Sequence, residues 1–241
     1  MNDSISFPHQ TAQVLYEDYL DITSTSERGS FQKSEQATGP KVTLGMPQEW
    51  DLLALSSQQN KVLPSEMILM SQEADFYLVK LAITFHPQKD TLINWAQLTV
   101  YLRPEKAGFG VPIAFDLYPK AIIDESKTDV KLGISPEVKF SEISFKLGEV
   151  STLFEHRNFA PIMTGFGLLE SRPVWEFQHH KSHPLKGSRE SYMIIKKPHD
   201  SGAVRITLDA TVEGTMANQI FNARRKQSHS THCSHIFCQG G

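Results

Sequence analysis

The chain has 241 residues, of which 39% are hydrophobic and 21% are charged, so it is long and apolar enough to bury a sizeable core. Its formal net charge of −3 is too small to imply a polyanionic partner, and nucleic acid is therefore not expected as a ligand. The acidic residues gather near the start, because residues 1–75 carry eleven acids and four bases whereas residues 76–241 carry sixteen acids and twenty bases.

The opening segment, residues 1–70, is predicted to be a polar and largely disordered lead. Residues 23–40 consist mostly of Ser, Thr, Gln and Gly with scattered charge. They lack the apolar surface that would offset an ordering cost of about 1–2 kcal/mol per residue. Two apolar islands, residues 11–20 and 48–55, interrupt the lead. Each is interpreted either as a helical turn docked on the main domain or as a recognition segment that becomes ordered on a partner.

The start and the cysteine content suggest a compartment. The first residues lack a basic stretch followed by a long apolar run, and no stretch approaches the ~18 apolar residues that a membrane span needs. The two cysteines lie five residues apart near the end, which is not a disulfide framework. We therefore expect a cytoplasmic, reducing environment and no membrane partner.

From residue 73 onward the apolar residues recur with a period of two, which is typical of half-buried strands. In residues 76–85, Val79, Leu81 and Ile83 share one face while Lys80 and Thr84 lie on the other. Similar alternation follows in later segments. The residues expected to face the core are Val79, Leu81, Ile83, Leu98, Val100, Ile113, Phe115, Ile206 and Leu208.

The spacing of these segments predicts the fold class. About eight strands fit between residues 73 and 214, and no helical pattern of crossover length separates them. The sequence therefore predicts an all-β fold, an antiparallel β-sandwich or partly open barrel, over residues 71–214. Within residues 137–147 the apolar parity slips by one, which indicates either a β-bulge or two strands. Residues 215–241 are predicted to form a short helix and a disordered tail.

Catalytic signatures are missing from the sequence. It contains no phosphate-binding G-x-x-x-x-G-K-[ST] loop, no G-x-S-x-G nucleophile elbow and no H-E-x-x-H metal motif. Their absence favours a protein that is not an enzyme.

An irregular apolar stretch, residues 159–169, is the first candidate binding surface. It is rich in Gly but has no regular period, so it either plugs one end of the sandwich or presents an adhesive surface. The candidate binding residues are Phe159, Ile162, Met163 and Phe166, together with Trp175 from the strand that follows.

A histidine cluster is the second candidate. His179, His180 and His183 lie between two predicted strands, with lysines and an arginine close by in sequence. The cluster is interpreted either as a cationic loop that meets an acidic partner, a nucleic-acid backbone or a sugar, or as a solvated hairpin loop. Metal binding by these histidines is a weaker alternative, because no carboxylate lies near them in sequence.

The last thirteen residues contain both cysteines and three histidines. Thiolate and imidazole are the ligands that zinc prefers, and the short spacing would let one loop wrap an ion. A structural site normally gathers two separate ligand pairs, however, so a solvated tail is the leading interpretation, with redox use of the thiols as a further alternative. No cofactor is expected, and zinc is the alternative. The candidate ligands are His229, His232, Cys233, His235 and Cys238.

Three functional hypotheses follow from these features. The first is a non-enzymatic β-sandwich that acts as an interaction or accessory module and binds another protein in a multi-protein assembly. The second is a small-molecule or carbohydrate binder or hydrolase with a site in the sandwich loops. The third is a zinc-binding protein that uses the C-terminal tail.

Overall fold

The computed structural model of the chain describes residues 5–8, 10–19, 40–105, 109–123, 137–140, 143–146, 161–216, 219–225 and 231–232. The elements in this part are β1 (Ile5–Ser6), β2 (Val14–Tyr19), β3 (Lys41–Gly45), β4 (Gln48–Asp51), α1 (Leu52–Gln58), α2 (Ser65–Met70), β5 (Ala74–His86), β6 (Thr91–Pro104), β7 (Ile113–Tyr118), β8 (Ala121–Ile123), β9 (Glu137–Phe140), β10 (Ile143–Lys146), β11 (Pro161–Phe166), β12 (Val174–Gln178), β13 (Gly187–Pro198), η1 (His199–Ser201), β14 (Val204–Met216), β15 (Gln219–Arg225) and β16 (Thr231–His232).

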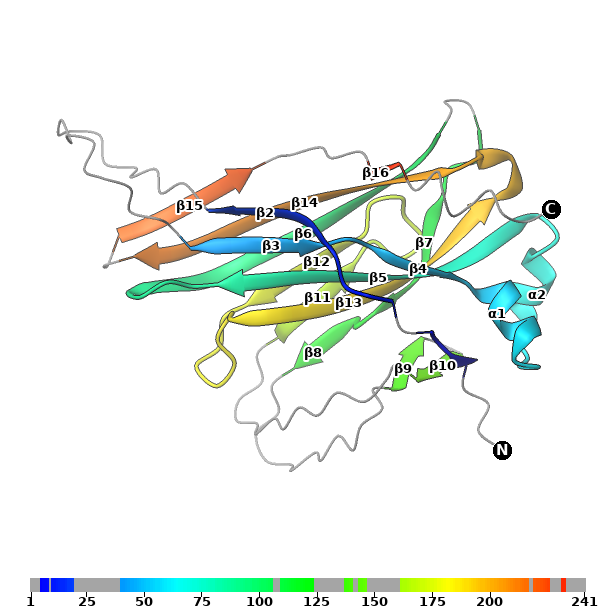
Figure 1. Cartoon of the computed structure of the whole chain (residues 1–241), viewed down its shortest axis with the longest axis horizontal. Helices are drawn as coiled ribbons and strands as arrows, with labels where there is room; N and C mark the ends of the chain where they lie inside the picture. The colour runs from blue at the N-terminus through cyan, green and yellow to red at the C-terminus, as the bar shows by residue number, and fades with distance from the viewer. Residues whose placement is uncertain are drawn as a thin grey trace.

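Two large antiparallel sheets form a sandwich, which confirms the predicted all-β fold (Figure 1). The first sheet has the order β2-β3-β5-β13-β7, and β4 pairs with β5 beyond the end of β3. The second sheet has the order β15-β14-β6-β12-β11-β8, and β16 also pairs with β14. In a smaller sheet, β9 pairs with β10 and β10 runs parallel to β1. The parity slip in residues 137–147 therefore separates two strands.

The main core lies between the two sheets. Val79, Leu81 and Ile83 of β5 face Leu98 and Val100 of β6, and all five are almost fully buried. The alternation read from the sequence is correct here, because each of these strands buries one face against the opposite sheet. Ile206 and Leu208 of β14 also lie in this core, as expected.

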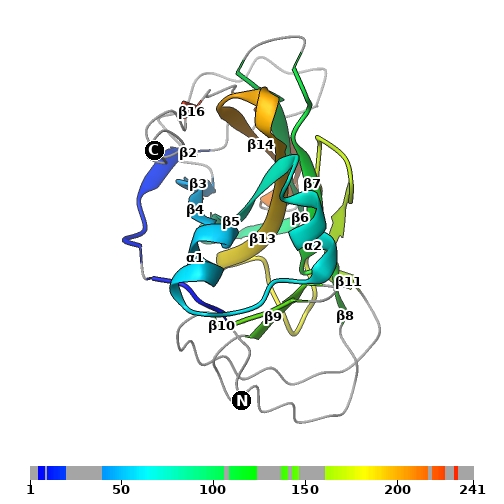
Figure 2. The same cartoon turned by 90° about the vertical axis from the view of Figure 1, so that its right-hand side faces the viewer.

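A second, smaller core covers the outer face of the first sheet at one end. Phe76 and Leu78 point away from the main core and are fully buried beneath Trp50, Leu52 and Met67. Figure 2 shows α1 and α2 side by side at this end of the sandwich. At Leu78 and Val79 β5 is therefore buried on both faces, whereas Asp75 and Tyr77 nearer its start are half-buried.

The disordered lead predicted over residues 1–70 is wrong for most of its described part, which includes β1 and β2 before residue 20 and every residue from 40 to 70. Residues 40–70 form β3, β4, α1 and α2, and they bury Val42 and Leu44 in the main core. The first island is the strand β2 rather than a helical turn, because its backbone pairs with β3. The second island is β4 and α1, which dock on the first sheet; α1 begins where Asp51 Oδ1 accepts a hydrogen bond from Ala54 N at 2.9 Å. Residues 20–39 lie outside the described part.

Two further expectations are wrong. In β7 the buried residues are Ala114, Asp116 and Leu117, whereas Ile113 and Phe115 are half-buried. Phe115 instead packs edge-on against Phe76 of the second core, with ring centroids 5.3 Å apart. The helix predicted after residue 214 is the strand β15, because β14 offers it a free edge for backbone pairing.

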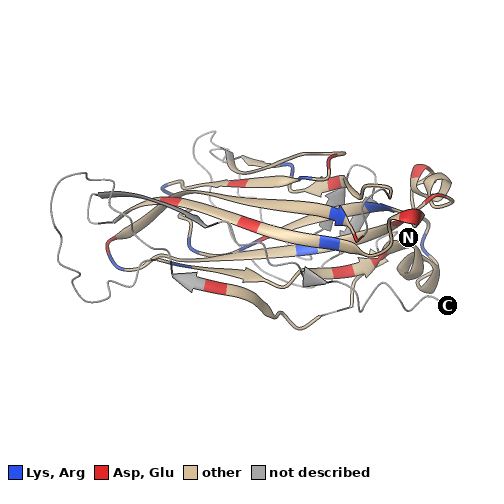
Figure 3. Cartoon of the chain, turned by 90° about the horizontal axis from the view of Figure 1, so that it is seen from above, with Lys and Arg blue, Asp and Glu red and all other residues tan. Residues whose placement is uncertain are grey.

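No helix within the described residues is both long enough and apolar enough to cross a membrane. Charged residues lie at separate places along the strands, with both signs present, rather than in one large patch of a single sign (Figure 3).

Candidate interaction surface

The turn between β11 and β12, residues 166–169, carries three large apolar residues, one before and two after Gly167; we call it the apolar turn. The exposed fractions are 49% for Phe166, 46% for Leu168 and 59% for Leu169. Exposure of one such residue is common, but three within four residues form a contiguous apolar feature. The exposed part of the irregular stretch is therefore this turn.

Backbone hydrogen bonds hold the apolar turn to both sheets. Leu169 N donates to Ala114 O at 2.8 Å and Ala114 N donates to Glu170 O at 2.9 Å, which ties the turn to β7 at the edge of the first sheet. Leu102 N donates to Ser171 O at 2.8 Å, which ties the following residues to β6 in the second sheet. The turn thus bridges the two sheets along the side of the sandwich, and its backbone is fixed before any partner arrives.

The backbone of the turn is strained at Leu169. Glu170 N donates to Gly167 O at 3.1 Å, so Leu169 is the third residue of a four-residue turn, and its φ is +63°. Glycine or asparagine normally occupies that position, since a left-handed backbone costs other L-residues about 1–2 kcal/mol. Strain at an exposed apolar residue is a feature that accompanies binding sites. Gly167 itself has φ +84°, and a Cβ there would lie 2.8 Å from Arg172 O.

The other residues predicted for this surface lie inside the molecule. Ile162, Met163 and Trp175 are 8%, 3% and 0% exposed, so they cannot contact a partner on the folded surface. Met163 and Trp175 belong to the main core. Phe159 lies outside the described residues. Within the described residues the stretch divides in two: β11 is a strand of the second sheet that supplies core residues, and the turn after it is exposed.

The histidine cluster lies in a tight hairpin loop whose two lysines, Lys181 and Lys186, are exposed. His180 N donates to His183 O at 3.3 Å and His183 N donates to His180 O at 3.0 Å. His183 is 9% exposed, and Arg189 donates to the carbonyl oxygen of Pro184 at 3.0 Å, which holds the loop closed. Burial, followed by the neighbouring charge of His180, lowers the pKa of His179. His179 is thus poorly suited to carry positive charge at neutral pH, and the His183 ring is too buried to face a partner.

The candidate zinc ligands of the tail fall mostly outside the described residues. His229, Cys233, His235 and Cys238 are not described, and only the backbone of His232 is placed, opposite Arg205 in the pairing of β16 with β14. Among the residues that are described, no three His, Cys, Asp or Glu side chains gather as a metal site.

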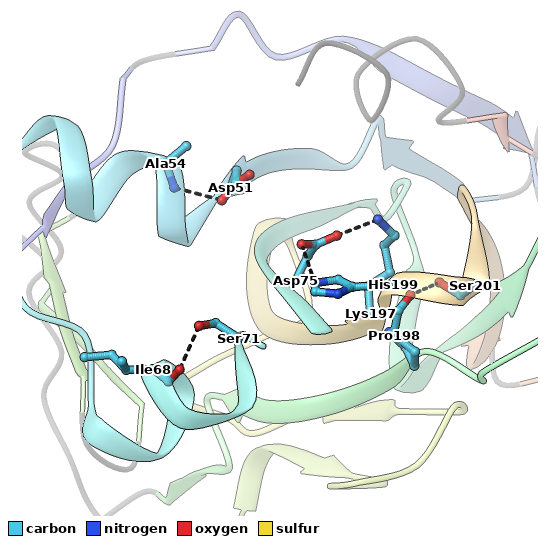
Figure 4. Close-up of polar contacts among 9 residues, drawn as sticks. All are labelled: Asp51, Ala54, Ile68, Ser71, Asp75, Lys197, Pro198, His199 and Ser201. Carbon is cyan, nitrogen blue, oxygen red and sulfur yellow. Dashed lines mark hydrogen bonds and ion pairs between the residues drawn. The ribbon is translucent and has the colours of Figure 1, made fainter. Parts of the chain in front are cut away.

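A polar cluster lies at the end of the inner face of the first sheet. Lys197 Nζ lies 2.7 Å from Asp75 Oδ2, and His199 Nε2 lies 3.2 Å from Asp75 Oδ1, so the carboxylate bridges β13 and η1 (Figure 4). Lys197 Nζ also lies 5.6 Å from the centroid of the Tyr77 ring. Burial is the main cause that raises the pKa of the Tyr77 phenol, and nearby carboxylate charges raise it further.

Glu49 of β4 is a buried carboxyl group on the same sheet. It pairs with Val79 and so points to the inner face of the first sheet, where it is 7% exposed. Neither carboxylate oxygen has a hydrogen-bond partner among the described residues. Burial raises the pKa of Glu49 from an ordinary 4.5 to about 7. The sequence carried no signal for this, because Glu49 lies in the island 48–55, whose pairing with β5 no local pattern predicts.

Comparisons with known proteins give no family. No family model matches the chain, and no curated protein matches it. One similar solved structure is the NetB toxin of Clostridium perfringens in its membrane-inserted form, with 8% identity, a TM-score of 0.35 and coverage of 92% of this chain and 94% of the toxin chain. Another is described as a pore forming protein, with 10% identity, a TM-score of 0.32 and the same coverage. Neither likeness is close enough to carry an argument about function.

Proposed function

We propose that the protein is a non-enzymatic β-sandwich module that binds another protein through the apolar turn. The single observation that carries this proposal is Leu169, a large apolar residue that is 59% exposed and held in a left-handed backbone conformation. A chain selected for stability alone would place glycine or asparagine at this position. Burial of the leucine side chain in a complex would offset the cost of this backbone conformation.

The fixed backbone of the turn supports the same proposal. Binding is stronger when the contacting residues are already ordered, because little conformational entropy is lost on association. The hydrogen bonds to Ala114 and from Leu102 order the turn on both sides. The partner surface that fits it is an apolar concavity that accepts Phe166, Leu168 and Leu169 together, since buried apolar anchors supply most of the affinity of an interface.

Site-specific photocrosslinking tests the proposal. A photoreactive side chain placed at position 169 of the full chain is expected to form one dominant adduct with another protein in cells that make this chain naturally. The matched control places the same side chain at Val62, which is 86% exposed in the segment between α1 and α2. An equal set of adducts from both positions, or none from position 169, would count against a binding role for the apolar turn.

A further inference from the structure

The outer face of the second sheet carries a cluster of arginines around one tyrosine. Val100 and Leu102 of β6 point into the main core, so Tyr101 and Arg103 point outward. Val100 N and Leu102 N donate to Pro173 O and Ser171 O at 2.9 and 2.8 Å, so the chain before β12 continues along β6. This continuation sets Arg172 beside Tyr101 on the outer face.

The Tyr101 ring holds two guanidinium groups. Cζ of Arg172 lies 5.1 Å from the ring centroid, and Cζ of Arg103 lies 5.9 Å from it. Attraction between a cation and the face of an aromatic ring acts within about 6 Å and fixes the positions of both groups. Two positive charges are thereby gathered at one spot.

A third arginine, Arg205, lies on the neighbouring strand β14. In the pairing of β14 with β6, Arg205 is directly opposite Arg103. Opposed residues of an antiparallel pair have their Cβ atoms about 4.5–5.5 Å apart, and like charges at that spacing destabilise the sheet. Arginine stays protonated at any ordinary pH, so this repulsion is not relieved by losing a proton.

Carboxylates do not neutralise the cluster within the described residues. Arg103, Arg172 and Arg205 form no ion pair there, and Arg205 Nε is shielded from solvent without a hydrogen-bond partner. On β14 and β12 the acids of this face are Asp209 and Glu176, which pair with Thr99 and Gln97 farther along β6. Glu105 follows Arg103 by two residues but forms no ion pair with the arginines among the described residues. Glu176 Oε1 already accepts a hydrogen bond from Gln97 Nε2 at 3.2 Å.

We propose that Arg103, Arg172 and Arg205, gathered around Tyr101, form a binding site for a tetrahedral oxyanion, a phosphate or sulfate group. Guanidinium groups bind such oxygens through paired N–H donors, which gives both strength and orientation. An oxyanion between Arg103 and Arg205 replaces cross-strand repulsion by two attractions. Arg103 and Arg172 are exposed, so the group can be a free ion or the end of a larger ligand. This inference is independent of the protein-binding role of the apolar turn.

Titration of the isotope-labelled full chain with inorganic phosphate and with sulfate tests the site, at constant ionic strength set with chloride. We expect saturable NMR shifts at Tyr101 and the three arginines, with a dissociation constant in the millimolar range or below, and a higher melting temperature in phosphate than in chloride. A parallel titration with a phosphomonoester distinguishes a free ion from a group on a larger ligand, since tighter binding of the ester indicates further contacts.

Matched variants separate a site from general charge attraction. Arg103→Gln and Arg205→Gln should each weaken phosphate binding about tenfold or more, since each removes a charge-assisted pair of donors. Lys89→Gln removes one charge from the exposed turn between β5 and β6 and should leave binding unchanged. In chloride alone, Arg205→Gln should melt no lower than the original chain because repulsion is removed. Three results would each overturn the proposal. The first is NMR shifts that fail to saturate, and the second is a loss of phosphate binding in Lys89→Gln as large as in the arginine variants. The third is a lower melting temperature of Arg205→Gln than of the original chain in chloride.

Discussion

Replacing Trp175 with alanine is expected to lower the free energy of unfolding by about 3–5 kcal/mol, measured by urea denaturation. The indole is 0% exposed in the main core, between the two sheets and opposite Gly165 of β11. Removal of so large a side chain costs its transfer free energy and leaves a cavity that the rigid sheets cannot fill. This result would establish the residue as a core residue rather than a partner contact.

Two control variants test whether the loss of stability in Trp175→Ala comes from removing a buried aromatic ring. Phe166→Ala on the exposed turn should cost about 1 kcal/mol or less, because that ring loses little burial. Trp175→Phe should cost clearly less than Trp175→Ala, since it keeps an aromatic ring and removes Nε1, which is buried without a partner among the described residues. Equal losses for Phe166→Ala and Trp175→Ala would mean that the placement of β12 is wrong.

Replacing Glu49 with glutamine is expected to change the pH dependence of stability. Below pH 4.5 the carboxyl group is protonated in both the folded and the unfolded chain, and it carries no penalty. Between pH 4.5 and about 7 the unfolded chain loses this proton while the folded chain keeps it, so stability falls as pH rises. Above about pH 7 the full penalty remains, roughly 3 kcal/mol from the size of the shift. The stability gain of Glu49→Gln should therefore grow over this pH range and then stay constant.

Gln48→Ala is the matched control for Glu49→Gln. Gln48 lies next to Glu49 on β4, points to the opposite face and donates a hydrogen bond to Gln10 O at 2.9 Å. Its loss should cost the same at every pH, because no titrating group is removed. The measurement is urea denaturation of the original chain, Glu49→Gln and Gln48→Ala at pH 4, 5.5, 7 and 8.5. If Glu49→Gln raises the free energy of unfolding by the same amount at every pH, the carboxyl group is hydrated in the folded protein.

The sequence predicted the central strands well because each buries one face against one opposing sheet. Val79, Leu81 and Val100 follow this simple rule. The rule fails where a strand has a second neighbour on its outer face. Phe76 and Leu78 serve the second core, and the covering residues come from a segment whose polar composition predicted disorder. Composition averaged over 70 residues hides a short ordered stretch of this kind.

The site was only partly predictable for a related reason. The irregular stretch 159–169 was recognised as apolar, but the sequence could not divide it into buried residues of β11 and an exposed turn. That division depends on hydrogen bonds from the turn to β6 and β7, which are distant in sequence. The arginine cluster was missed although Tyr101 and Arg103 alternate with core residues. Its convergence requires the register of β14 and β12 against β6, which no local pattern encodes.

The affinity of the crosslinked partner for Leu169→Asn tests the proposed role of the apolar turn most directly. Asparagine tolerates the left-handed backbone at this position, so the variant should melt at or above the temperature of the original chain. It removes an apolar side chain worth about 1.5–3 kcal/mol when fully buried, so the dissociation constant should rise about tenfold or more. An unchanged dissociation constant with an intact fold would contradict binding through the turn.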